Sequence, residues 1–133
     1  MKDLIKSIID SEIIDVNLYM KEAELFKNKI VNGEHIHDIF INFAKEETLH
    51  ISALKIILKE EYKHNNFEVK VSNSLRKTLR VHLMREGESI RVYENLITKI
   101  GNDKYKETIS EIIFQENWHY KTMKKYLLSI GLK

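Results

Sequence analysis

Two short motifs of the same form could bind a metal. Glu47-Thr48-Leu49-His50 and Glu116-Asn117-Trp118-His119 each place a glutamate three residues before a histidine. On an α-helix, residues three apart lie on one face, so each motif would present a carboxylate beside an imidazole. Oxygen and nitrogen donors of this kind bind divalent transition metals. We therefore interpret each motif as a metal-ligand pair.

These polar residues interrupt apolar stripes that should face a core. Stepping seven residues either way gives Phe40 and Leu54 for Glu47, Phe43 and Ile57 for His50, Ile109 and Met123 for Glu116, and Ile112 and Tyr126 for His119. Apolar residues at this spacing mark the buried face of a helix. A buried ionised carboxylate is costly unless a partner neutralises it. The neighbouring helices should therefore show what balances the charge.

The segment before each motif carries one further carboxylate in its apolar stripe. The seven-residue ladders read Ile5, Glu12, Tyr19, Phe26 in the first segment and Leu79, Glu86, Tyr93, Ile100 in the third. Each ladder has a single glutamate followed by a tyrosine two helical turns later. The chain is thus two copies of one unit, a helix with one buried glutamate followed by a helix with Glu-x-x-His.

Two further polar residues share a face with the lone glutamates. Asp15 lies three residues after Glu12, and His82 lies four residues before Glu86. Asp15 is either an extra ligand or an outer partner of the site. For His82, a hydrogen bond to the site and a purely structural role are equally compatible with the spacing.

Other polar and aromatic residues are assigned to the surface or to packing. Glu22 and Glu24 sit among lysines and are expected on a solvated face, and Glu46 is expected to flank the site. Trp118 and Tyr120 are expected to pack at a helix interface.

Length and composition favour one helical domain over residues 1–133. The chain has no proline and four glycines, which suits long uninterrupted helices. The expected helices span about 2–31, 34–63, 73–100 and 104–129, with a crossover at 64–72. Asn32-Gly33 should end the first helix, Ser72 or Ser74 should cap the third, and Gly101-Asn102-Asp103 should separate the last two.

Charge and cysteine content exclude several classes of function. The formal net charge is +2, with acids and bases nearly balanced, which argues against a nucleic-acid or membrane-surface protein. The absence of cysteine excludes disulfides, thiol catalysis and Cys-x-x-Cys rubredoxin sites in this sequence. No apolar run approaches the ~18 residues of a membrane span, and no signal peptide is evident. A cytoplasmic location is the default expectation.

The candidate ligands are of borderline hardness and favour two divalent cations. Four glutamates and two histidines form an oxygen-rich set whose charge two cations balance better than one. Iron or manganese suits such a set better than zinc, which favours four-coordinate nitrogen and sulfur sites.

On these residues, the sequence resembles the ferritin-like superfamily and, within it, the rubrerythrin and erythrin group. The paired Glu-x-x-His motifs, each preceded by a helix with a lone core glutamate, match the pattern of four-helix di-iron and di-manganese proteins over nearly the whole chain. The resemblance implies an all-α, ferritin-like four-helix bundle of two helix pairs. It implies two iron ions, or alternatively two manganese ions, held by Glu12, Glu47, His50, Glu86, Glu116 and His119. Tyr19 and Tyr93 would donate hydrogen bonds to these carboxylates.

The sequence departs from rubrerythrins in two respects. Rubrerythrins carry an additional carboxylate three residues after the glutamate of the third helix, where this chain has Ser89. That departure weighs against a rubrerythrin-type peroxidase. They also usually carry a rubredoxin domain, so electrons here would come from an external donor protein such as a rubredoxin.

The crossover suggests an exchange of helices between two chains. In the ferritin-like arrangement it must cover the length of a helix, ~40 Å for ~27 residues, whereas nine residues from His64 to Ser72 reach only ~30 Å. Either the helix ends unwind to lengthen the crossover, or the helix pairs of two chains exchange in a homodimer.

The leading function is reduction of hydrogen peroxide by a di-iron pair that an outside donor then re-reduces. Alternatives are a ferroxidase that uses dioxygen in iron handling, a dimanganese catalase and a di-iron oxygenase. A plain helical bundle, in which the buried Glu and His residues only hydrogen-bond one another, is the non-metal alternative.

Overall fold

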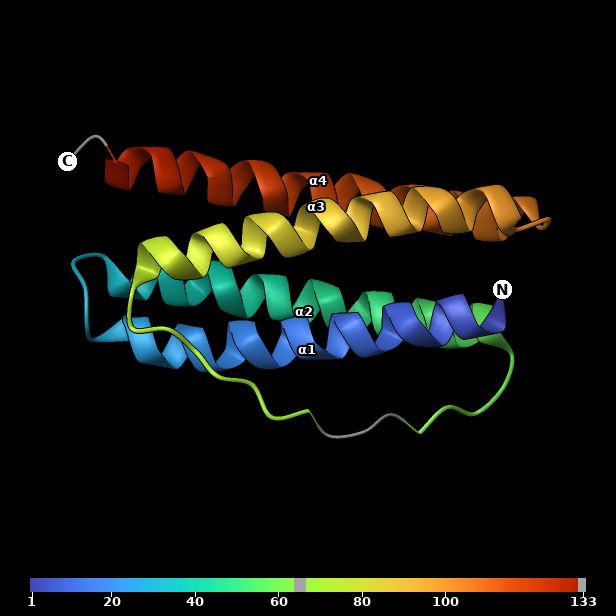
Figure 1. The fold of residues 1–133 in the computed structure, drawn as a ribbon, viewed down its shortest axis with the longest axis horizontal. Helices are drawn as coiled ribbons and strands as arrows, with labels where there is room; N and C mark the ends of the chain where they lie inside the picture. Colours follow the sequence, from blue (N-terminus) through green and yellow to red (C-terminus); the bar gives the residue numbers. More distant parts are fainter. Residues whose placement is uncertain (64–66, 132–133) are drawn as a thin grey trace. The chain divides into compact units, whose positions relative to one another are not determined.

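The described part of the chain consists of four long α-helices joined by short turns and one longer linker (Figure 1). The computed structural model describes residues 1–63 and 67–131. The helices are α1 (Lys2–Lys27), α2 (Gly33–Leu58), α3 (Leu75–Lys99) and α4 (Asp103–Gly131). No strand occurs within these described ranges. The prediction of an all-α fold with two helix-pair repeats is confirmed, because α1 packs on α2 and α3 packs on α4.

The chain divides into two compact units. The first covers Lys2–Asn73 and holds α1, α2 and the linker, and the second begins at Ser74 and holds α3 and α4. Each unit therefore contains one copy of the repeat seen in the sequence. None of the described helices is long and apolar enough to cross a membrane.

The turn between α1 and α2 is tighter than the sequence predicts. We expected the first helix to continue to Val31, but α1 ends at Lys27. A Cβ on Gly33 would clash with the carbonyl oxygens of Phe26 and Lys27, and Asn32 adopts a left-handed conformation with φ 62°. Because glycine at this position lets α2 start directly against the last turn of α1, the chain leaves the first helix early.

The linker is longer than expected and runs along α1. The second helix ends at Leu58 rather than Lys63, since Lys59 adopts a left-handed conformation with φ 60° and its N–H donates to the Lys55 carbonyl. The side chain of Asn17 donates to the Phe67 carbonyl at 3.3 Å, and the Lys21 ammonium donates to the Val69 carbonyl at 3.2 Å. The linker thus advances along α1 in the direction of that helix, as Figure 1 shows.

Further contacts fix the start of the linker near the beginning of α1. Glu60 forms ion pairs with Lys6 at 2.7 Å and Lys2 at 3.1 Å, and the Tyr62 hydroxyl donates to the Asp10 carboxylate at 2.9 Å. Sixteen residues separate Leu58 from Leu75, enough to reach ~53 Å at ~3.3 Å per residue. The nine-residue estimate was wrong, and the crossover has the length to span a helix within one chain. His64, Asn65 and Asn66 lie outside the described residues.

In the second unit, side chains cap both helices. The Ser74 hydroxyl accepts from the Lys77 N–H at 3.2 Å, as one of the two predicted caps of α3. The Asn102 side chain accepts from the N–H groups of Lys104 and Tyr105 at 2.9 and 3.2 Å, which starts α4. These are the side-chain caps that free helical N–H groups require.

The two aromatic residues beside His119 have different environments. A Cβ on Gly87 would lie 3.9 Å from the Tyr120 ring, so Tyr120 packs between α3 and α4 as predicted. Trp118 is 60% exposed, and its predicted place at a helix interface is wrong for the described chain. Trp118 lies two residues, or about 200°, from the buried Glu116, so it points to the outer face of α4.

Candidate metal centre

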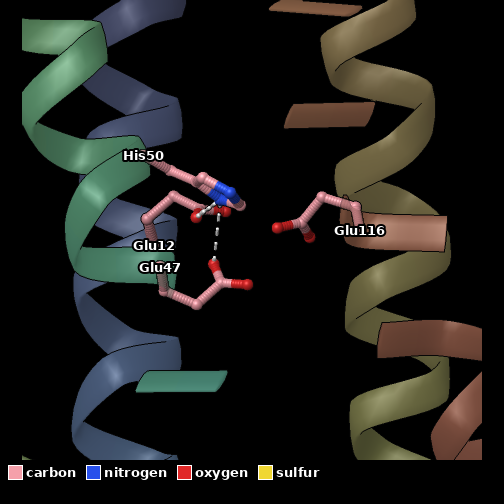
Figure 2. A group of neighbouring side chains, drawn as sticks. All are labelled: Glu12, Glu47, His50 and Glu116. Atoms are coloured by element: carbon pink, nitrogen blue, oxygen red, sulfur yellow. Dashed lines mark hydrogen bonds and ion pairs between the residues drawn. The ribbon is translucent and has the colours of Figure 1, made fainter. Parts of the chain in front are cut away.

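In the first unit, α1 and α2 bring three buried polar side chains together. Glu12 comes from α1, and Glu47 and His50 come from adjacent turns of α2; all three are at most 2% exposed. His50 Nδ1 lies 3.2 Å from Glu12 Oε2 and 3.9 Å from Glu47 Oε2. Figure 2 shows these side chains pointing toward one another. We call this group the first half-site.

In the second unit, α3 and α4 bring the equivalent residues together. Glu86 comes from α3, and Glu116 and His119 come from α4; all three are fully buried. His119 Nδ1 lies 3.6 Å from Glu86 Oε1. We call this group the second half-site; Glu116 is labelled in Figure 2.

The two half-sites have the same construction. In each, the histidine of a Glu-x-x-His helix contacts the lone glutamate of the helix before it, His50 with Glu12 and His119 with Glu86. Within each half-site, every residue offers a ligand atom and these atoms lie within 4.8 Å of one another. The repeat in the sequence is therefore also a repeat in side-chain geometry.

The electrostatics of the second half-site favour a bound cation. Burial, and after it the nearby Glu116 carboxylate, raise the pKa of Glu86 to about 8, while His119 opposes the shift. Crowding two carboxylates in a low-dielectric interior disfavours their ionised forms. A divalent cation would reverse this preference by neutralising both, so the oxygen-rich donor set fits iron or manganese.

Both predicted tyrosines are buried. Tyr19 and Tyr93 are 0% exposed, and the Tyr19 ring packs against Phe40 and Phe43 of α2 at centroid distances of 5.5 and 5.6 Å. This packing fixes the Tyr19 ring. The predicted hydrogen bonds from the tyrosine hydroxyls to ligand carboxylates remain a prediction.

Asp15 and His82, whose roles the sequence leaves open, are both buried. Asp15 and His82 are each 1% exposed, whereas Ser89, which lies three residues after Glu86 as Asp15 does after Glu12, is partly exposed. Among the described residues, the groups of closely spaced ligand atoms include neither Asp15 nor His82. Both therefore lie outside the ligand groups.

One buried carboxylate was assigned wrongly from the sequence. Glu22 is 4% exposed rather than solvated. Glu22 follows Tyr19 by three residues and precedes Phe26 by four. This spacing places it in the core stripe of α1 and indicates a buried side chain. By contrast, the Glu24 side chain is 73% exposed and lies 3.5 Å from His37, and Glu46 accepts a hydrogen bond from Asn42 beside the half-site.

The comparison with protein families decides the assignment. The sequence model of the family described as Rubrerythrin matches residues 3–127. The chain belongs to the rubrerythrin family. The predicted resemblance is confirmed, and membership in this ferritin-like family indicates a metal centre and oxidoreductase activity in general. The comparison with curated proteins found no match.

Proposed function

We propose that the chain is a di-iron peroxidase that reduces hydrogen peroxide with electrons from a separate donor protein such as a rubredoxin. The observation that carries the proposal is the pair of equivalent, buried half-sites, each with two carboxylates and one imidazole. Membership in the rubrerythrin family supports the choice of redox chemistry. We also propose a cytoplasmic location, where such a donor would be available.

In this proposal the six ligands hold two iron ions. Glu12, Glu47 and His50 of the first half-site and Glu86, Glu116 and His119 of the second would supply the donor atoms. When bound and reduced, the pair supplies the two electrons that cleavage of the peroxide bond requires. A dimanganese centre in the same ligands is the alternative metal content.

The side chains of the protein would have three tasks. The imidazoles of His50 and His119 lie against the carboxylates of Glu12 and Glu86. These contacts would hold the carboxylates in position to bind metal. Glu86 would release its proton when metal binds, because a cation favours its ionised form. Burial of all these residues limits the access of water to the site.

A ferroxidase is the second candidate, and Ser89 favours it. The position three residues after Glu86 lacks the additional carboxylate of rubrerythrins and is partly exposed. A six-ligand site of this kind would oxidise ferrous iron with dioxygen as part of iron handling.

Rapid mixing separates these functions. The protein is loaded anaerobically with two ferrous ions per chain and mixed with peroxide or, separately, with dioxygen, and oxidation is followed by near-ultraviolet absorbance. Faster oxidation by peroxide is the expected result. Faster oxidation by dioxygen would instead support a ferroxidase or an oxygenase, and peroxide dismutation by the manganese-loaded protein would support a catalase. Glu46→Leu, beside the half-site, is the control and should behave as the wild type does.

A further inference from the structure

The outer face of α4 carries a large exposed aromatic pair. Phe114 is 76% exposed and Trp118, one turn later, is 60% exposed. With Asn117 and Lys121 they line a shallow depression. Aromatic side chains are enriched at interaction surfaces relative to the rest of the protein surface.

The aromatic pair lies at the centre of a regular exposed row along α4, which we call the α4 seam. Its members are Glu107, Glu111, Phe114, Trp118, Lys121 and Lys125, and all six are exposed. Their spacing alternates between four and three residues, so they lie within about 40° of one line along the helix. This is the spacing of the contact positions in a two-stranded coiled coil.

The seam is symmetric in position and opposite in charge about its midpoint. Measured from Glu116, the acids stand at −9 and −5, the aromatics at −2 and +2, and the bases at +5 and +9. An antiparallel second copy that crosses at Glu116 would place Glu107 beside the partner's Lys125, and Glu111 beside the partner's Lys121. Phe114 would then face the partner's Trp118. A parallel, in-register copy would instead place like charges together.

We propose that the α4 seam joins two copies of this chain in an antiparallel, two-fold symmetric dimer. Isologous interfaces require a self-complementary surface, and the order acid, aromatic, base meets that requirement. Two symmetric Phe–Trp contacts would form the apolar centre, and four Glu–Lys pairs would flank it and select the antiparallel direction. Glu116 and His119 lie on the buried face of α4, so this contact leaves both half-sites inside their own units. It differs from an exchange of helix pairs and does not depend on the proposed function.

Charge-swapped chains test the seam. Glu107→Lys/Glu111→Lys gives a chain with a wholly basic seam, and Lys121→Glu/Lys125→Glu gives one with a wholly acidic seam. Sedimentation and light scattering across a range of concentrations should find a dimeric wild type, while each variant alone should dissociate with a dimer constant weakened roughly 100-fold. Mixing the two variants in equal amounts should restore a dimer, because every charge pair is then favourable. All of these positions are exposed, so both variants should fold, as circular dichroism would show.

A matched control and an independent readout complete the test. Lys106→Glu/Lys124→Glu changes the net charge as the acidic variant does, but these exposed lysines lie about 100° from the seam, so dimerisation should persist. Trp118 is the one tryptophan of the chain, and its emission should shift to shorter wavelength as the dimer forms. The proposal is overturned by a monomeric wild type at all concentrations, by seam variants that dimerise as the wild type does, or by a mixture that stays monomeric.

Discussion

The imidazole of His50 lies 3.2 Å from the carboxylate of Glu12, although the two residues are 38 positions apart in the sequence. The contact joins α1 to α2 inside the first half-site and has a counterpart between His119 and Glu86. Each helix pair thus positions its candidate ligands through a buried contact between side chains. Such contacts hold ligands in orientation and reduce the ordering required when metal binds.

Replacing Glu12 should weaken the binding of one metal ion. Glu12→Gln keeps the shape of the side chain and removes its charge, so the affinity for one of two ferrous or manganous ions should fall by about 10–100-fold or more. Isothermal titration calorimetry under anaerobic conditions measures this. Glu24→Gln, on the exposed face of the same helix, is the matched control. Equal metal affinity in both variants would show that Glu12 is not a ligand.

Removing the two motif glutamates should preserve the fold and abolish metal binding. Glu47 and Glu116 are both 0% exposed, and replacing buried charges with apolar residues is often neutral or stabilising by about 1–4 kcal/mol. Glu47→Leu/Glu116→Leu should therefore keep or raise the free energy of unfolding of the metal-free protein, as urea denaturation measures, and metal analysis should find no bound iron or manganese. Retention of metal by the folded variant would refute the ligand assignment.

The metal-free protein should lose stability as the pH rises. The pKa of Glu86 is raised from 4.5 to about 8. Below pH 4.5 both the folded and the unfolded chain hold this proton. Between pH 4.5 and 8 only the folded chain holds it, so the contribution of Glu86 to the free energy of unfolding falls with rising pH and levels off above about 8.

Glu86→Gln isolates this effect. The variant cannot titrate at position 86, so the wild type should lose more stability than the variant between pH 5 and pH 8 in urea denaturation without metal. Metal affinity of the wild type should rise over the same range, because binding displaces the proton. A wild-type stability that rises with pH relative to Glu86→Gln would contradict the raised pKa.

Two glycines should respond to alanine in opposite ways. At Gly33 a Cβ meets the backbone carbonyls of Phe26 and Lys27, which cannot move without disturbing α1, so Gly33→Ala should cost about 2 kcal/mol or more of unfolding free energy. At Gly87, inside α3, an added Cβ would lie 3.9 Å from the Tyr120 ring, which is an ordinary van der Waals contact. Gly87→Ala should therefore stabilise by about 0.5–1 kcal/mol through helix propensity. Thermal denaturation compares the two, and a neutral Gly33→Ala would contradict the close turn.

The helical faces could be predicted from the sequence because helical periodicity is a local property. The seven-residue ladders around Glu12 and Glu86 predict core positions, and the structure buries both residues. The i, i+3 spacing likewise predicts that Glu47 and His50 share a face. Spacing also identified all six candidate residues, and the family resemblance assigned them the role of ligands.

Helix ends and individual surface positions were less predictable, because they depend on local backbone geometry and on competing signals. The left-handed Lys59 ends α2 before Lys63, and nothing in its residue type indicates that conformation. The lysines near Glu22 indicated a solvated side chain, but its position in the apolar stripe of α1 places it in the core, where it is buried. The residue type of Trp118 indicated packing at a helix interface, whereas its position around the helix places it on the exposed face of α4.

The number of metal ions bound per chain tests the central claim most directly. Anaerobic titration of the metal-free protein with ferrous iron, followed by separation of unbound metal and elemental analysis, gives this number. If the six candidate ligands hold two metal ions, the wild type should bind two ions per chain and Glu47→Leu/Glu116→Leu should bind none. A wild type that binds no ferrous or manganous ions, or whose bound metal survives that double substitution, would contradict the account.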